Sequence, residues 1–303
     1  MSREVIGIDL GGTGIKLGRV GTDGNLIKTI SVPTPQPANP EDVFATIVEA
    51  IAFLDPDGIS TAIGVGLPGP TDARGRIAKV SINLPGWVDI PLADWLEAKF
   101  HKPTIIANDA NCAGLGEAWL GAGRNFPNFI LLTLGTGVGG AIIFNGELFS
   151  GHYGAAGELG LITLYPDGPT CNSGNNGSLE QFVSIRAIRR RTGLEPAELG
   201  VLAANGDSRA LEFWQEYGRD LGIGISSLVY VLTPDAVILG GGVSGSAKFF
   251  LPATRAEVER RVLFTSRENL QIIPAQLGNQ AGIFGAAKIA FEVIGMGEKG
   301  KLV

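Results

Sequence analysis

The sequence is poor in the residues that mark several classes of protein. It holds two cysteines, Cys112 and Cys171, and two histidines, His101 and His152. Two cysteines cannot form the disulfide framework of a small secreted protein. Neither histidine accompanies a Gly-x-Ser-x-Gly or reactive-cysteine motif, so we find no Ser/His or Cys/His nucleophile. The low cysteine content favours the reducing cytoplasm as the location.

Positive charge and long apolar runs are also scarce. The net charge is −6 at pH 7, which argues against nucleic acid or an anionic membrane as the main partner. No run of about 18 apolar residues offers a transmembrane helix, and the chain enters a predicted strand at Val5 without a signal peptide. We therefore expect a cytoplasmic protein with no membrane and no nucleic-acid partner. Its 303 residues, 45% of them hydrophobic, suffice for two domains of ordinary size.

Glycine is the residue in excess, with 45 copies, roughly twice the usual share of about 7%. Two glycine-rich stretches resemble each other, Ile8–Lys16 and Thr133–Gly140. In each, an apolar strand enters a glycine turn that contains a threonine, and a second apolar strand follows. Without side chains, the backbone N–H groups of such a turn can point at phosphate oxygens, and the threonine hydroxyl adds a donor. The pair predicts a duplicated fold that binds a polyphosphate from both sides.

The second stretch also fits a different interpretation. The spacing within Gly135–Gly140 matches the Gly-x-Gly-x-x-Gly fingerprint of dinucleotide-binding proteins, which requires a helix directly afterwards. Here Ala141–Phe144 is a strand-like run closed by Asn145-Gly146, a strong hairpin signal. The chain has no Walker A pattern either. A phosphate-binding turn between two strands is therefore favoured over a Rossmann site.

Apolar periodicity predicts an α/β protein whose plan occurs twice. Strands are expected at Val5–Asp9, Ile15–Val20, Leu26–Val32, Ala62–Val65, Thr104–Ala107, 129–134, 141–144 and Ala236–Leu239. Helices are expected from Pro40 onward, at Pro91–Phe100, near 178–192, at 208–231 and from near Gly282. The last helix should pack back onto the first domain. We expect a small domain of residues 1–108 plus a C-terminal helix at about 284–303, a large domain of residues 109–283, and a cleft between them.

Asp109 is the strongest candidate for chemistry. It follows the predicted strand Thr104–Ala107, where Asn108-Asp109 begins an alanine-rich helix. One interpretation is a helix N-cap, for which aspartate is favoured. The other is a general base that accepts the proton of an attacking hydroxyl. The helix dipole keeps such a carboxylate ionised and weakly basic, which suits phosphoryl transfer because its loose transition state needs mainly positioning.

Three further carboxylates lie in or beside glycine-rich segments. Asp9 precedes the first turn, where a metal-bound phosphate needs a counter-ligand, usually through water. Glu158 and Glu180 could accept hydrogen bonds from neighbouring hydroxyls of a sugar. Ser178-Leu179-Glu180-Gln181 is also a capping box, so Glu180 has a purely structural interpretation as well.

Taken in order, these motifs resemble those of the ROK family of sugar kinases, in the pattern of its bacterial glucokinases, over nearly the whole chain. The segments that carry the resemblance are Asp9–Thr13, Leu67–Pro70, Asn83–Trp87, Asn108–Asn111, Leu134–Ala141, Gly151–Gly160, Glu180 and Leu239–Val243. The resemblance implies a two-domain actin-like ATPase fold, which is a duplicated ribonuclease H-like α/β fold with an interdomain cleft.

The resemblance also implies a reaction and its residues. The γ-phosphate of ATP would pass to the C6 hydroxyl of glucose, with Mg²⁺ present, Asp109 as catalytic base and a homodimer or homotetramer as the assembly. The sugar would contact Gly69, Asn83, Asn108, Asp109, Glu158 and Glu180. ATP and Mg²⁺ would contact Asp9, Gly11, Gly12, Thr13, Gly14, Lys16, Gly135, Thr136, Gly137, Val138, Gly139, Gly240, Gly241 and Gly242.

The chain departs from the family at a structural zinc site. Many members have Gly-His after the first glutamate and then a CxCGxxGCxE segment, whose histidine and three cysteines bind zinc. Here Leu161 stands for the histidine, Ser173 and Ser178 stand for two of the cysteines, and Cys171 remains. One thiolate with two hydroxyls and a leucine cannot complete a tetrahedral zinc site, so we expect no structural zinc. Because the family histidine also touches the sugar near its anomeric end, the preferred hexose stays open.

Several alternatives remain at this stage. The kinase could act on mannose, fructose or an N-acetylhexosamine, or could use polyphosphate as donor, although no basic track favours that donor. Sugar-sensing repressors of the same family carry an N-terminal helix-turn-helix, for which we see no room before Asp9. A non-catalytic sugar-binding protein is disfavoured because Asp109 and both turns are present. We also expect sugar binding to close the two domains and exclude water.

Overall fold

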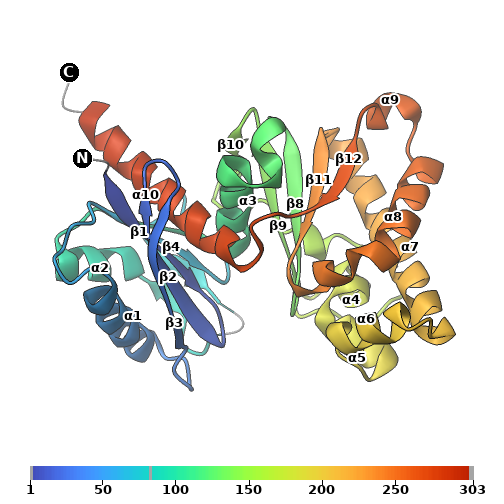
Figure 1. Ribbon diagram of the computed structural model, residues 1–303, viewed down its shortest axis with the longest axis horizontal. Helices are drawn as coiled ribbons and strands as arrows, with labels where there is room; N and C mark the ends of the chain where they lie inside the picture. The colour runs from blue at the N-terminus through green and yellow to red at the C-terminus, as the bar shows by residue number, and fades with distance from the viewer. Residues whose placement is uncertain (1–2, 82–83, 300–303) are drawn as a thin grey trace. The chain divides into compact units, whose positions relative to one another are not determined.

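The computed structural model describes residues 3–81 and 84–299 of the chain (Figure 1). It divides into two compact units. The first comprises Met1–Arg124, Leu148–Ala156 and Asn279–Val303, and the second comprises Asn125–Glu147 and Gly157–Gly278. Each unit contains a five-stranded sheet. The predicted domain limits at residues 108 and 283 stay a prediction.

The first unit is built on a mixed sheet with the strand order β3-β2-β1-β4-β7. The strands are β1 (Glu4–Leu10), β2 (Gly14–Gly21), β3 (Leu26–Pro33), β4 (Ile63–Leu67) and β7 (Thr104–Asn108). The first three are antiparallel neighbours, whereas β4 runs parallel to both β1 and β7. The helices α1 (Pro40–Leu54) and α2 (Leu92–Phe100) cover one face, and α3 (Asp109–Leu120) and α10 (Ala281–Lys299) cover the other (Figure 1).

Alternation along β1 explains this two-sided packing, since successive side chains of a strand point to opposite faces. Ile6 and Ile8 are fully buried in the cluster that includes Val43 and Ile47 of α1. Between them, Gly7 faces α10. The alternating sequence therefore supplies an apolar surface to one helix layer and a flat backbone surface to the other.

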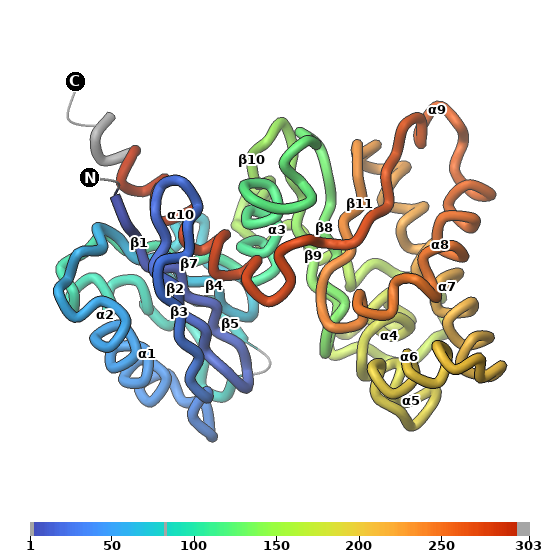
Figure 2. The backbone as a smooth tube through the Cα atoms, viewed as in Figure 1, coloured from blue at the N-terminus to red at the C-terminus, as the bar shows by residue number. Residues whose placement is uncertain are grey.

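Glycine allows α10 to approach the sheet closely. A methyl group on Gly7 would lie 2.2 Å from the carbonyl oxygen of Ile283, and one on Gly64 of β4 would lie 1.9 Å from that of Ala286. Any larger residue at either position would push the helix away from the sheet. The last helix thus packs against the sheet formed by the N-terminal strands, as its apolar pattern predicts, and the tube in Figure 2 follows this return of the chain.

The second unit has the strand order β10-β9-β8-β11-β12. Its strands are β8 (Phe129–Leu134), β9 (Val138–Phe144), β10 (Glu147–Leu148), β11 (Ala236–Gly240) and β12 (Gln271–Pro274). Its helices are α4 (Glu180–Val183), α5 (Ile185–Thr192), α6 (Pro196–Ala204), α7 (Ser208–Leu232), α8 (Ala247–Arg261) and α9 (Phe264–Arg267). The core gathers Trp214 and Tyr217 of α7 with Phe250 of α8, all fully buried.

The hairpin β8–β9 with the parallel neighbour β11 repeats the plan of β1–β2 with β4. The predicted duplication is therefore confirmed. A strand, and not a Rossmann helix, follows the second glycine turn, although β9 begins at Val138 and not at Ala141. The short elements outside the prediction are the hairpin β5 (Ala78–Val80) and β6 (Val88–Ile90), α6, α8, α9, β12 and the 3₁₀ turns η1 (Ala122–Asn125), η2 (Leu159–Leu161), η3 (Gly242–Ser246) and η4 (Gly278–Gln280).

The helix expected near residues 178–192 is in fact two helices. Ser184 has an extended backbone and separates α4 from α5, and its hydroxyl accepts a hydrogen bond of 3.1 Å from the amide of Ala187. Ser184 therefore lies after the last residue of α4 and caps the N-terminus of α5 with its side chain.

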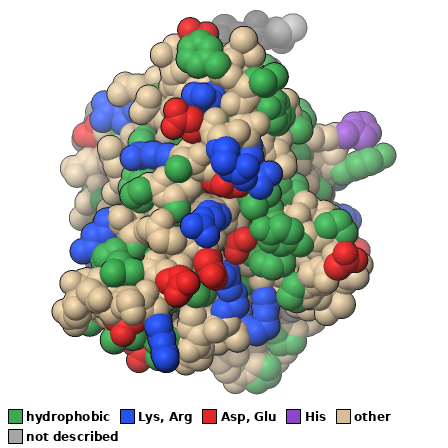
Figure 3. All heavy atoms as spheres, turned by 90° about the vertical axis from the view of Figure 1, so that its right-hand side faces the viewer, with side chains coloured by type: hydrophobic (Ala, Val, Ile, Leu, Met, Phe, Trp, Pro, Cys, Tyr) green, Lys and Arg blue, Asp and Glu red, His purple; other side chains and the backbone are tan. Residues whose placement is uncertain are grey.

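The surface shows no large single-sign field on the face drawn in Figure 3, where basic and acidic side chains are interspersed with apolar ones. Within the described residues, every helix is too short or too polar to cross a membrane.

Candidate active site

The first glycine turn is shaped by hydrogen bonds from its own unit. The amide of Gly11 donates to the carbonyl of Gly14 over 2.9 Å. From the segment after β3, the Thr34 hydroxyl donates to the carbonyl of Gly11 over 2.7 Å, and the Gln36 amide donates to that of Gly12 over 3.0 Å. These three carbonyls of the turn thus accept hydrogen bonds from protein groups, which fix its shape.

Asp9 lies at the carboxyl end of β1, directly before this turn. Its carboxylate is 3.5 Å from the ammonium group of Lys16 on β2. Burial raises the pKa of Asp9 above its ordinary value, although Lys16 acts in the opposite direction. A cation near this carboxylate would compensate the lost hydration, so the residue fits a role beside a metal-bound phosphate.

The second glycine turn has a similar internal bond that spans one residue fewer, from the amide of Gly135 to the carbonyl of Gly137 over 2.9 Å. The third glycine segment, which follows β11, lies beside it. Gly240 pairs with Thr133 in the sheet. Gly241 has a positive φ of 83°, and a methyl group there would lie 2.4 Å from the carbonyl oxygen of Leu134. The structure therefore brings together the two glycine segments that the sequence assigned to ATP within this unit.

The start of α3 separates the two interpretations of Asp109. The N-cap is Asn108, whose side-chain oxygen accepts from the amides of Ala110 over 2.9 Å and Asn111 over 3.1 Å. Asp109 is the first helical residue, and its carboxylate accepts from the amide of Ala110 over 2.8 Å. The N-cap interpretation of Asp109 is therefore wrong, since the neighbouring residue Asn108 has that role.

Asn108 also ties this helix start to the predicted sugar loop. Its side-chain nitrogen donates to the carbonyl of Gly69 over 3.2 Å. An amide nitrogen carries two hydrogens, so the same group can donate to a ligand as well. Asn83, another predicted sugar contact, lies outside the described residues.

Asp9 and Asp109 belong to the same edge of the first sheet. Asp9 pairs with Gly66 of β4, and Asn108 of β7 pairs with Leu67, so three parallel strands end side by side. The fully buried Cys112 lies near both carboxylates. Burial raises the pKa of its thiol well above the ordinary value, and the charges of Asp9 and Asp109 raise it further.

Gly66 makes this arrangement possible, and sequence reasoning did not assign it a role in the site. A methyl group on Gly66 would lie 3.1 Å from the sulfur of Cys112 and 3.6 Å from the Cα atom of Asp109. The available signal was a glycine directly after the buried strand Ala62–Val65. A small residue there lets the helix that begins at Asp109 approach the strand ends.

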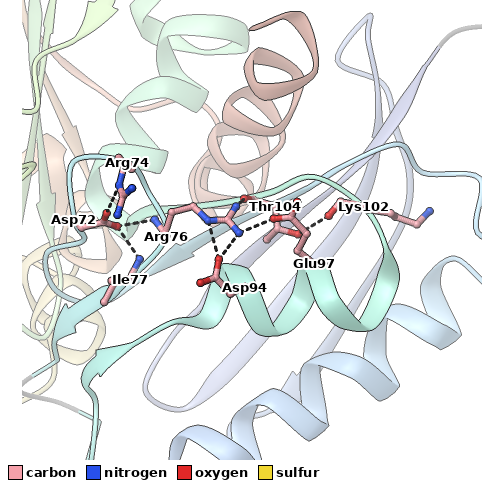
Figure 4. A network of polar contacts seen from close by, with 8 residues as sticks. All are labelled: Asp72, Arg74, Arg76, Ile77, Asp94, Glu97, Lys102 and Thr104. Carbon is pink, nitrogen blue, oxygen red and sulfur yellow. Dashed lines mark hydrogen bonds and ion pairs between the residues drawn. The ribbon is translucent and has the colours of Figure 1, made fainter. Parts of the chain in front are cut away.

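The loop that contains Gly69 is anchored on both sides (Figure 4). The Asp72 carboxylate accepts from the backbone amides of Arg76 over 2.6 Å and Ile77 over 2.7 Å. These bonds hold the pKa of Asp72 below its ordinary value, although burial acts in the opposite direction. The carbonyl of Gly75 accepts from the amide of Ile106 in β7 over 2.9 Å. The loop is thereby joined to the strand that leads to Asn108.

Arg76 extends this anchor to α2. Its guanidinium donates to the carboxylates of Asp94 and Glu97 and, over 2.7 Å, to the carbonyl of Thr104 at the start of β7 (Figure 4). A planar guanidinium with five donors can satisfy several acceptors at once. Arg76 thus joins the loop, the helix and the strand that position Gly69 and Asn108.

In the second unit, the two predicted sugar glutamates lie near each other. Glu158 follows Gly157, and its pKa is raised first by burial of its carboxyl group and then by the charge of Glu180. Glu180 is the first residue of α4, and Ser178 does not cap that helix, whose N-cap residue is Leu179. The capping-box interpretation is therefore wrong. The Glu180 carboxylate instead accepts a hydrogen bond of 2.9 Å from the amide of Val138 in the second glycine turn.

The segment that corresponds to the family's zinc site has a different chemistry here. Cys171 is buried, which would raise the pKa of its thiol, but the nearby groups of Ser173 and Ser178 outweigh this and hold the pKa below the ordinary value. One thiol with two hydroxyls beside Leu161 does not fit the four N or S ligands of structural zinc. Among the described residues, no group of three or more histidine, cysteine and acidic residues is placed to bind a metal.

Hydrogen bonds join the two halves of this segment. The Asn175 amide donates to the carbonyl of Leu161 over 3.1 Å and to the hydroxyl of Thr163 over 2.9 Å. The amide of Leu179 donates to the carbonyl of Ile162 over 2.9 Å. Hydrogen bonds therefore connect the segment after Glu158 to the segment before Glu180.

A phosphate-type glycine turn between two strands, present once in each of two similar α/β units, defines the two-domain actin-like ATPase fold that the sequence predicted. The ROK family description matches residues 5–293. The chain therefore belongs to the ROK family.

Individual relatives resemble the chain over almost its full length. The glucokinase of Thermotoga maritima is 33% identical over 312 residues, which cover 96% of this chain and 98% of that protein. The ROK family glucokinase of Streptomyces griseus, solved in complex with glucose and AMPPNP, is 33% identical, with a TM-score of 0.84 and coverage of 95% of this chain and 99% of that one. The ROK hexokinase of Thermus thermophilus is 35% identical, with a TM-score of 0.82 and coverage of 96% and 99%.

Proposed function

We propose that this protein is a glucokinase, which transfers the γ-phosphate of ATP to the C6 hydroxyl of glucose. The observation that carries the proposal is the full-length similarity, in sequence and fold, to an enzyme solved with glucose and an ATP analogue. The similarity to a second glucokinase supports the same conclusion. The geometry of Asp109 is compatible with it, because Asn108, and not Asp109, is the N-cap of α3.

In this proposal Asp109 accepts the proton of the sugar hydroxyl as that oxygen attacks the γ-phosphate. Phosphoryl transfer depends mainly on positioning and charge stabilisation, so a weak base at a helix N-terminus is adequate. Asn108 holds the loop of Gly69 at the sugar, and Glu158 and Glu180 accept hydrogen bonds from its hydroxyls. Asn83 is proposed as a further sugar contact from the resemblance alone.

The donor side of the proposal uses the glycine segments. The backbone amides of Gly11–Gly14 and Gly135–Gly139 are proposed to bind the phosphates of ATP, with the hydroxyls of Thr13 and Thr136 and the ammonium group of Lys16. Gly240–Gly242 are proposed to lie on the adenosine side. Asp9 would hold Mg²⁺ through water. When bound, Mg²⁺ would neutralise the negative charge on the transferring phosphate.

The remaining parts of the proposal rest on the family resemblance. We propose a cytoplasmic enzyme that assembles as a homodimer or homotetramer, without structural zinc. Elemental analysis of purified protein should find well under one zinc per chain, and a full equivalent would contradict our interpretation of Leu161, Ser173 and Ser178. A polyphosphate donor is disfavoured, since the sequence contains no basic track that favours it.

A coupled ADP-release assay tests the function. The full chain is offered glucose, mannose, fructose and N-acetylhexosamines in turn, with ATP or polyphosphate as donor. We expect the highest kcat/KM with glucose and ATP. A clear preference for another hexose would show that the protein is a kinase of that sugar. If no sugar on the panel supports ADP formation, the proposed kinase activity is refuted.

A further inference from the structure

Glu180 contacts the second glycine turn directly. Its Oε2 atom accepts a hydrogen bond of 2.9 Å from the backbone amide of Val138. Val138 is buried, whereas Glu180 is partly exposed. A carboxylate that accepts a backbone N–H forms a charge-assisted bond, which is shorter and stronger than a neutral one. The glutamate therefore fixes the peptide plane between Gly137 and Val138.

The turn is also shaped to receive this carboxylate. A methyl group on Gly137 would lie 2.3 Å from Oε2 and 3.2 Å from the carboxyl carbon of Glu180, but 3.8 Å from Oε1. A side chain at this position would therefore displace the Glu180 carboxylate from the turn. One edge of the carboxylate lies against the turn, and Oε1 lies further from it.

The other oxygen of Glu180 is suited to a second partner. A carboxylate offers about four acceptor positions on its two oxygens, and the contact with Val138 uses one of them. Glu158 is close enough for the charge of Glu180 to raise its pKa. Glu180 thus lies close both to a second acid and to the glycine turn.

We propose that Glu180 is a positioning residue for the ATP-binding turn as well as a sugar ligand, so that one carboxylate couples the affinity for sugar to the affinity for nucleotide. This inference rests on the proposed function. A sugar hydroxyl bound at Oε1 restrains the carboxylate, and the restrained carboxylate holds the Val138 amide and the turn around it. By linkage, nucleotide and sugar must then strengthen each other's binding by the same factor.

The first experiment separates the positioning role from the sugar role. Isothermal titration calorimetry measures the affinity of the full chain for Mg–AMPPNP without sugar, in the wild type, Glu180→Ala, Glu180→Gln and Glu212→Ala. Glu180→Ala should weaken binding about tenfold, because the Val138 amide loses its partner. Glu180→Gln should stay within about threefold, because its side-chain oxygen can accept the same hydrogen bond. Glu212→Ala, at an exposed position of α7, should match the wild type.

The second experiment measures the coupling itself. The same titrations are repeated at saturating glucose, and the ratio of the two affinities gives the coupling factor. We expect glucose to tighten nucleotide binding about fivefold or more in the wild type and in Glu212→Ala, and not in Glu180→Ala. Glu212→Ala is the control, since it removes an equal charge from an exposed position of α7 that has no role in the proposed site.

The outcomes distinguish the inference from the function on which it rests. Wild-type nucleotide affinity in Glu180→Ala without sugar, together with wild-type coupling, would overturn the inference even if the enzyme phosphorylates glucose. Loss of nucleotide binding in Glu180→Gln as severe as in Glu180→Ala would also overturn it. Absence of sugar-dependent ADP formation by the wild type would refute the function instead. Far-ultraviolet circular dichroism and melting curves confirm that each variant is folded.

Discussion

The two glycine turns have the same backbone design but are supported by different kinds of group. In the turn of Gly11–Gly14, the neutral side chains of Thr34 and Gln36 donate to backbone carbonyls. In the turn of Gly135–Gly139, the carboxylate of Glu180 accepts from a backbone amide. The first turn is therefore held by groups with no proposed contact to the substrate. The second depends on an ionisable group that also belongs to the proposed sugar site.

The proposed acids differ between the units in the same way. Asp109 begins a helix that its neighbour Asn108 caps, and its carboxylate accepts from the amide of Ala110 within that helix start. Glu180 instead accepts from the distant second glycine turn. In the proposed function, the first unit therefore supplies the base beside a separate cap, whereas the second unit combines support of the turn and sugar binding in one residue. The following predictions test this difference, from the largest expected effect to the smallest.

The largest effect is expected at Asp109. Asp109→Asn should lower kcat by about 10² to 10⁴-fold, because the amide cannot accept the proton of the attacking hydroxyl. The melting temperature should change little, since Asn108 provides the cap. Steady-state kinetics and thermal melts measure both quantities. Asp42→Asn, an equal change in the first turn of α1, is the control and should leave kcat unchanged. Near-normal turnover of Asp109→Asn would disprove the base assignment.

The next prediction compares one glycine from each turn without any ligand. A methyl group on Gly12 meets no atom within 4 Å, whereas one on Gly137 lies 2.3 Å from the carboxylate of Glu180. Gly137→Ala should therefore cost about 1–3 kcal/mol of unfolding free energy, and Gly12→Ala less than about 0.5 kcal/mol. Urea titrations of both variants measure the difference. Equal effects would mean that the two turns are supported alike.

The third prediction concerns the support of the first unit. Arg76→Ala removes hydrogen bonds to Asp94, Glu97 and the Thr104 carbonyl (Figure 4). We expect a loss of about 1–2 kcal/mol, since its side chain is 29% exposed and solvent screens part of the interaction. Arg74, with a side chain 83% exposed, is the matched control, and Arg74→Ala should cost less than about 0.5 kcal/mol. If thermal melts of the two variants coincide, Arg76 does not anchor the loop.

The sequence was sufficient for the features that local patterns encode. Alternation and turn residues gave β1, β2 and the strand after the second turn, and the order of short motifs gave the family. Coordinates were needed to show that Asn108, and not Asp109, caps α3, and that Glu180 contacts the second glycine turn. Asn and Asp are equally good N-caps, so the pair Asn108-Asp109 left the cap undecided. The bond from Val138 to Glu180 joins residues 42 positions apart, and no local pattern encodes such a contact.

Some helix limits and helices of the second unit were missed because the local sequence pattern gave a different indication. One apolar pattern near residues 178–192 predicted a single helix, because the extended backbone of Ser184 does not interrupt the pattern. Pro252 lies inside α8, where proline argues against a helix in any prediction from sequence. Tertiary packing against α7 outweighs that local preference.

The smallest effect is expected in the pH dependence of sugar binding. Burial and the charge of Glu180 raise the pKa of Glu158 above 4.5, so as the pH falls Glu158 takes up a proton earlier than an ordinary glutamate does. The protonated acid accepts hydroxyl hydrogen bonds less well, and kcat/KM for glucose should fall on the acid side with a midpoint above pH 4.5. In Glu158→Gln, kcat/KM for glucose should be lower at neutral pH and should not show this fall at low pH.

The effect of pH on the free energy of unfolding has the opposite sign. A raised folded-state pKa favours folding below the unfolded value and loses that contribution as the pH rises, so Glu158→Gln should be slightly more stable than the wild type at pH 7. If the loss of kcat/KM at low pH persists unchanged in Glu158→Gln, another group causes it, and the pH dependence does not report the second unit's acids.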